Sequence, residues 1–80
     1  MAMLTPKRFH NIAKERNTIH VPVEATYTTF EKMGEKYFQI DTYGSDEREI
    51  PGKASQSIQI DEMMAKILIE KLEETFQLKK

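Results

Sequence analysis

The fold is decided by residues 37–76, which read YFQIDTY (37–43), GSDEREIPGKA (44–54), SQSIQI (55–60) and DEMMAKILIEKLEETF (61–76). The first and third pieces alternate apolar with polar residues, which is the period of a strand with one buried face. The last piece repeats its apolar residues every three or four positions, as an amphipathic helix does. The order predicts two strands joined by a charged loop and followed by a C-terminal helix.

The two strands are predicted to have one apolar and one polar face. The predicted core consists of inward strand residues and helix residues: Phe38, Ile40, Ile58, Ile60, Leu68 and Leu72. The polar face carries Tyr37, Gln39, Asp41, Tyr43, Ser57 and Gln59.

Asp61 is placed to cap the C-terminal helix, with Glu62 in its first turn. An apolar stripe follows at four-residue spacing: Met64, Leu68, Leu72 and Phe76. Met63 and Ile67 widen this apolar arc beyond what one small sheet covers. The surplus fits either a dimer built along the helix or a deep core groove.

A further strand is predicted over residues 18–30, where Ile19, Val21 and Val23 alternate with polar residues. Pro22 cannot donate to a ladder, so this strand would begin at an edge or break at a bulge. The polar linker 31–36 contains one glycine and suits a hairpin.

Residues 1–17 are predicted to be a basic N-terminal arm with a balance of +3, against −4 in residues 18–80. Thr5 and Pro6 are a reasonable helix start, so a short helix ending near Asn17 is expected. Residues 18–80 are expected to form one α+β domain. The positive charge of this arm has two explanations: it is either simply solvated, or it indicates an anionic partner.

An 80-residue chain forms one domain and is only marginally stable as a monomer. There is no cysteine to form a disulfide, and His10 and His20 sit in no ligand cluster, so a zinc staple is not expected. Oligomerisation is the remaining common means of stabilisation. We expect a small antiparallel sheet of three to four strands, with the helix packed on one face, in a homodimer.

Catalytic and targeting signals are weak. No nucleophile elbow or phosphate loop is present, and the loop acids Asp46, Glu47 and Glu49 are typical of solvated carboxylates. We therefore expect no enzyme activity, no metal and no cofactor. No run is apolar enough to cross a membrane, and the N-terminus has no signal-peptide core, which favours a cytoplasmic protein.

The polar face is the candidate binding surface. Tyrosines on an open sheet can stack unpaired bases, and amides can bond to base edges. Basic residues would supply phosphate contacts. The residues expected to bind nucleic acid are Tyr37, Gln39, Tyr43, Arg48, Lys53, Lys7 and Arg8. Asp41 would repel a phosphate. The alternative is that this face is solvent-exposed, binds nothing, and is stabilised by its own cross-strand pairs.

Residues 36–72, KYFQIDTYGSDEREIPGKASQSIQIDEMMAKILIEKL, resemble the positive-cofactor-four single-stranded-DNA-binding domain and its small prokaryotic relatives. The resemblance rests on a strand ending in an aromatic, a charged turn, the pair Gly52-Lys53, a short strand with Ile58 and an acid-capped helix. It implies a dimer formed through the C-terminal helix, with single strands held against curved sheets. It also implies contacts from Tyr37, Tyr43, Arg48 and Lys53.

Two functions remain open from the sequence. The first is a nucleic-acid-binding module for single-stranded DNA that acts as a dimer. The second is a small protein-interaction or regulatory accessory protein, without enzymatic activity, that docks on a larger partner through its basic arm or an open sheet edge.

Overall fold

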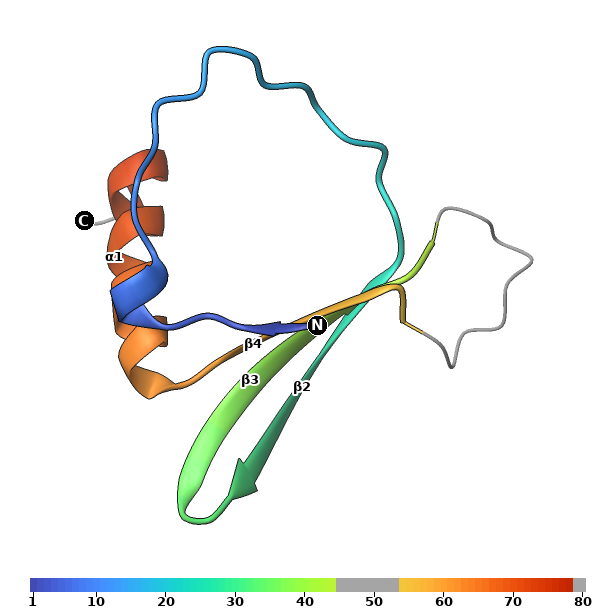
Figure 1. Ribbon diagram of the computed structural model, residues 1–80, viewed down its shortest axis with the longest axis vertical. Helices are drawn as coiled ribbons and strands as arrows, with labels where there is room; N and C mark the ends of the chain where they lie inside the picture. Colours follow the sequence, from blue (N-terminus) through green and yellow to red (C-terminus); the bar gives the residue numbers. More distant parts are fainter. Residues whose placement is uncertain (45–53, 79–80) are drawn as a thin grey trace.

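The computed structural model describes residues 1–44 and 54–78 as a four-stranded sheet with one α-helix (Figure 1). The strands are β1 (Ala2–Met3), β2 (Ala25–Lys32), β3 (Glu35–Thr42) and β4 (Gln56–Ile60), in the spatial order β1-β4-β3-β2. The 3₁₀ helix η1 (Pro6–Arg8) follows β1, and α1 (Glu62–Phe76) follows β4. The α+β class predicted from the sequence is confirmed.

The sheet is mixed rather than purely antiparallel. β3 pairs antiparallel with both β2 and β4, whereas β1 runs parallel to β4, with Ala2 opposite Ile58 and Met3 opposite Gln59. The backbone N–H of Leu4 also donates to the carbonyl of Gln59 at 3.0 Å. The first residues of the chain therefore belong to the sheet and not only to a basic arm.

The hairpin predicted for residues 31–36 is confirmed, with a tighter turn than expected. β2 continues to Lys32 and β3 begins at Glu35, so only Met33 and Gly34 form the loop. Both have positive φ, 54° and 81°, which is the conformation of a type I′ turn. This turn matches the twist of the paired strands, and it fixes the β2–β3 register.

The strand predicted over residues 18–30 begins only at Ala25. The last cross-strand bond at this end runs from the N–H of Tyr43 to the carbonyl of Glu24 at 3.0 Å. Beyond that bond, no strand in the described part of the chain lies beside residues 18–23. An isolated extended segment has no ladder to join, and Pro22 lacks the N–H that one would need.

The helix predicted from Pro6 to near Asn17 is wrong beyond its first turn. Only Pro6–Arg8 is helical, and Thr5 makes no side-chain cap bond. Phe9 is already extended, with φ −125° and ψ 106°. His10 and Asn11 are weak helix formers, and residues 9–17 are all exposed, so no packing extends the turn into the better helix formers that follow.

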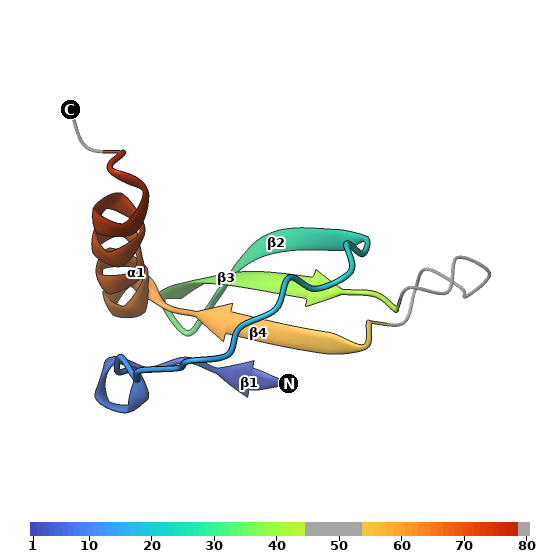
Figure 2. The same cartoon turned by 90° about the horizontal axis from the view of Figure 1, so that it is seen from above.

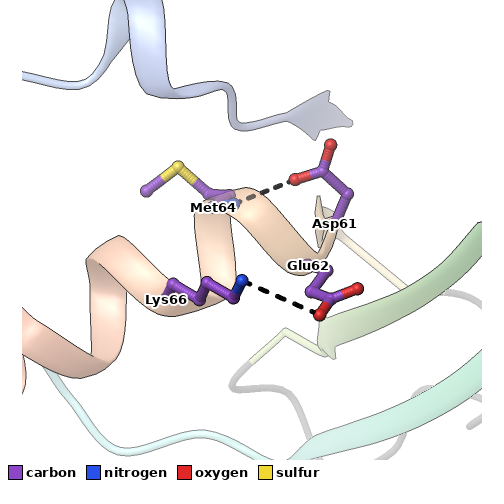
Figure 3. A network of polar contacts seen from close by, with 4 residues as sticks. All are labelled: Asp61, Glu62, Met64 and Lys66. Atoms are coloured by element: carbon purple, nitrogen blue, oxygen red, sulfur yellow. Dashed lines mark hydrogen bonds and ion pairs between the residues drawn. The ribbon is translucent and has the colours of Figure 1, made fainter.

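Helix α1 has both ends capped as its sequence suggests. The carboxylate of Asp61 accepts the backbone N–H of Met64 at 3.0 Å (Figure 3). The ion pair between Lys66 Nζ and Glu62 Oε2 lies on the exposed face at 4.0 Å. At the other end, Gln77 adopts the left-handed conformation and donates its N–H to the carbonyl of Glu73.

The helix stands at one end of the sheet instead of lying over a face (Figure 2). It contacts β4 and η1. Along its apolar stripe, Met64 is buried, Leu68 is half-buried, Leu72 is 42% exposed and Phe76 is 64% exposed. The packing of the helix on one sheet face, which the sequence predicted, is thus not seen.

The core predicted from the sequence is correspondingly incomplete. Met64 is the one hydrophobic residue that is buried among the described residues. Phe38, Ile60 and Leu68 are half-buried, but Ile40 and Ile58 stay more than a third exposed, since no helix or strand of the described ranges covers the sheet centre. No helix in the described ranges is long and apolar enough to span a bilayer.

Candidate nucleic-acid interface

The polar face of the sheet is formed as the sequence predicted. Tyr37, Gln39 and Asp41 alternate along β3 with the apolar residues Phe38 and Ile40. The ladders place polar neighbours beside them. Opposite Gln39 and Asp41 lie Thr28 and Thr26 from β2, and Gln59 and Ser57 from β4. The face is therefore a continuous polar surface across three strands.

A side-chain hydrogen-bond network joins the centre of this face. Gln39 Nε2 donates to both carboxylate oxygens of Asp41, at 3.0 and 3.1 Å. Ser57 Oγ donates to Asp41 Oδ1, and Gln59 Nε2 donates to Gln39 Oε1 at 2.7 Å. All four residues are half-buried. The network links β3 to β4 and satisfies the carboxylate with neutral donors.

This network determines what Gln39 can do. Its amide nitrogen and its amide oxygen are both engaged within the sheet, so base-edge contact from Gln39 requires exchange of one of these bonds. Gln39 thus positions Asp41 and Gln59 in the free protein. The cross-strand pairs that the sequence left as an alternative explanation of this face are present.

Tyr43 lies at one end of the polar face. It follows β3 directly, and its hydroxyl is 3.1 Å from Thr26 Oγ1, with either group able to donate. This bond places the ring of Tyr43 toward β2, on the face that carries Asp41. Tyr43 is half-buried, so part of its ring remains open to a ligand.

Tyr37 lies at the other end and stacks on Phe30, its partner in β2. The ring centroids are 5.4 Å apart and the planes are inclined by 25°. Tyr37 and Tyr43 are six positions apart, which corresponds to about 20 Å along an extended strand. The sheet therefore offers two separated aromatic platforms, with the polar network between them.

A shallow hollow of about 330 Å³ lies beside the network. It is lined by residues of β3 and β4 and by the first residues of the chain: Met1, Ala2, Met3, Gln39, Ser57 and Gln59. The hollow forms because β1 joins the edge of β4, which the sequence pattern did not indicate. Its lining combines amide groups with the flexible side chains of methionine.

The structure describes two of the four basic residues that the sequence predicted as phosphate contacts. Lys7 and Arg8 are exposed on η1, beside α1 at one end of the sheet (Figure 2). Tyr37 lies at this same end, since its neighbour Phe38 pairs with Ile60, the last residue of β4 before the helix. Arg48 and Lys53 lie outside the described residues, as does most of the charged loop.

Two contributors to the face were missed by sequence reasoning. Phe30 stacks on Tyr37, and Thr26 bonds to Tyr43. Both follow from the strand period, because even-numbered positions of β2 share one face. The interpretation of residues 18–30 as a single strand that ended at Phe30 concealed the Phe30–Tyr37 pair.

No metal-binding cluster accompanies this surface in the described part of the chain. Over residues 1–44 and 54–78, no group of three His, Asp or Glu side chains gathers in a way that would hold a metal ion. No family model, curated protein or solved structure matches the chain.

Proposed function

We propose that this protein is a nucleic-acid-binding module without enzymatic activity, which takes single-stranded DNA across the polar face and acts as a dimer. The observation that carries the proposal is the placement of Tyr37 and Tyr43 on one face, at the two ends of a polar network. Aromatic rings on an open sheet stack unpaired bases, at about 1–3 kcal/mol per base. The resemblance to the positive-cofactor-four domain supports the same role.

The geometry favours an unpaired strand over a duplex. Platforms about 20 Å apart reach bases several nucleotides apart in one extended strand. In a duplex those bases are paired and stacked within the helix, and their faces are closed to tyrosine. Bases would therefore face the sheet, while the sugar–phosphate backbone runs along its outer side.

Asp41 is compatible with this arrangement if phosphates stay away from the centre of the sheet. Its carboxylate is half-buried and bonded to Gln39 and Ser57, so it faces bases rather than the backbone. Phosphates would be bound at the periphery by Lys7 and Arg8, and by Arg48 and Lys53. Asp41 then weakens binding modestly without preventing it.

Fluorescence anisotropy with labelled oligonucleotides tests the proposal. Binding should favour single strands over the matched duplex and weaken between about 50 and 200 mM salt, because phosphate contacts release counterions. Tyr43→Ala should weaken binding by about fivefold to a hundredfold. Tyr43→Phe is the matched control, because it removes the bond to Thr26 but keeps the ring. Absence of binding at tens of micromolar protein in low salt would exclude the function.

A protein-interaction module is the second candidate, and the exposed apolar residues favour it. Leu72 and Phe76 on α1, and Ile40 and Ile58 on the sheet, remain open in the single chain. Surfaces of this kind mark protein interaction sites. A chain that binds no oligonucleotide but forms a stable complex with a larger protein in its own cells would have this function instead.

A further inference from the structure

The single chain exposes far more surface than a folded monomer of its size. Its accessible surface is 7823 Å², about 2,800 Å² more than the ~5,000 Å² expected for a compact monomer of this mass. Obligate dimer interfaces bury about 2,000–5,000 Å² in total over both partners. The surplus on each copy is therefore large enough to supply its half of such an interface.

One open area of apolar character is the sheet face opposite the polar network. Tyr27 is 71% exposed, Ile40 38% and Ile58 37%. These residues are neighbours, since Ile40 lies opposite both Tyr27 and Ile58 in the ladders. The charged residues of β2 and β3 on this face, Glu31 and Lys36, are cross-strand partners of opposite sign at the hairpin end, so the two strands give this face no net charge.

The connecting segment, residues 18–24, supplies a second observation. Ile19, Val21 and Val23 alternate with polar residues in the pattern of a strand, yet the segment is in no strand. Their exposed fractions are 100%, 72% and 43%. Figure 1 shows residues 9–24 as an arc that runs from η1 to β2 and lies away from the sheet up to Glu24, whose carbonyl accepts the N–H of Tyr43. A strand-like apolar segment that pairs with no strand in the described part of its own chain is suited to pairing with another chain.

We propose that two copies of this chain form an isologous dimer through the apolar sheet face around Tyr27, Ile40 and Ile58, and that the connecting segment of each copy lies on the other. In an isologous contact the same patch is used twice, so one apolar patch serves both partners. Both copies expose the same surplus area, as an isologous interface requires. The sequence indicated a dimer along the C-terminal helix, and this inference places the contact on the sheet. It does not depend on nucleic-acid binding.

Sedimentation velocity over about 1–100 µM protein tests the dimer, with a mass twice that of the 9.4 kDa chain expected. Tyr27→Glu and Val21→Glu should each raise the dimer dissociation constant by about tenfold or more, because each buries a charge at the interface. Thr28→Glu and His20→Glu are matched controls. They add the same charge one residue away, on the opposite side of the alternation, and should leave the constant nearly unchanged.

Val21→Glu should leave folding intact, since Val21 is exposed and outside every described strand, and circular dichroism of each variant checks this. A wild-type protein that stays monomeric at about 100 µM overturns the dimer. A dimer that resists Tyr27→Glu and Val21→Glu but dissociates with Phe76→Glu overturns the sheet contact and places the interface on the helix. A dimer that forms but binds no oligonucleotide supports this inference and excludes the proposed function.

Discussion

The side-chain amide of Gln59 on β4 donates to that of Gln39 on β3 at 2.7 Å, directly across the ladder in which the two residues are partners. Gln39 in turn donates a hydrogen bond to the carboxylate of Asp41, which also accepts one from the hydroxyl of Ser57. Two neighbouring cross-strand pairs thus form one network. It stabilises the β3–β4 pairing and holds the carboxylate in place on the polar face.

Removing Asp41 should destabilise the sheet. Asp41→Ala deletes the acceptor for Gln39 and Ser57 and leaves two half-buried donors without their partner. The expected loss is about 1–3 kcal/mol in the free energy of unfolding, measured by urea denaturation at fixed protein concentration. Thr28→Ala, on the exposed part of the same face, is the control and should change stability by less than about 0.5 kcal/mol. Equal effects of the two substitutions would contradict a stabilising network.

The charge of Asp41 should oppose nucleic-acid binding. Asp41→Asn removes one negative charge from the centre of the polar face, so the dissociation constant for a single-stranded oligonucleotide should fall several-fold at low salt. Asp61→Asn removes the same charge at the start of α1 and keeps a good helix cap. Fluorescence anisotropy should show a larger gain for Asp41→Asn. If both variants gain equally, net charge alone explains the effect and the polar face is not the binding surface.

The turn between β2 and β3 should accept a stabilising substitution. Met33 has φ of 54° and is 96% exposed, so it bears the strain of the left-handed region and contributes little packing. Met33→Asn gives the Asn-Gly pair favoured in type I′ turns and should stabilise the protein by about 0.5–1 kcal/mol. Thermal unfolding should show a rise of a few degrees. Met33→Val, which is β-branched, should lower the midpoint, and the opposite order would show that this turn does not form.

Local pattern predicted the elements whose partners lie nearby in the sequence. The strand period identified β3, β4 and the polar face, and Asp61 marked the start of α1 to the residue. The hairpin was foreseen, although the strands extend to within two residues of each other. In each case the local backbone geometry and a partner that is close in the sequence determine the structure. The local sequence is therefore enough to predict these elements.

The elements that depend on distant partners were not predictable. Ala2 and Met3 pair with β4 across more than fifty residues, and nothing in their own pattern indicates a strand. Residues 18–23 have the pattern of a strand, but they join no ladder among residues 1–44 and 54–78. The exposed C-terminal end of the stripe on α1, Leu72 and Phe76, likewise shows that an amphipathic pattern identifies a face without identifying what covers it.

Helix α1 should depend strongly on its N-terminal cap, because little of it is packed. Asp61 accepts the N–H of Met64, whereas the ion pairs of Lys66 with Glu62 and of Lys71 with Glu74 are exposed and stabilise the helix by at most a few tenths of a kcal/mol each. Asp61→Ala should therefore cost about 1 kcal/mol, seen as a lower urea midpoint by circular dichroism at 222 nm. Asp61→Asn should be nearly neutral, because the amide oxygen caps as well. A loss that is equal for Ala and Asn would mean that the charge, acting on the helix dipole, matters more than the hydrogen bond.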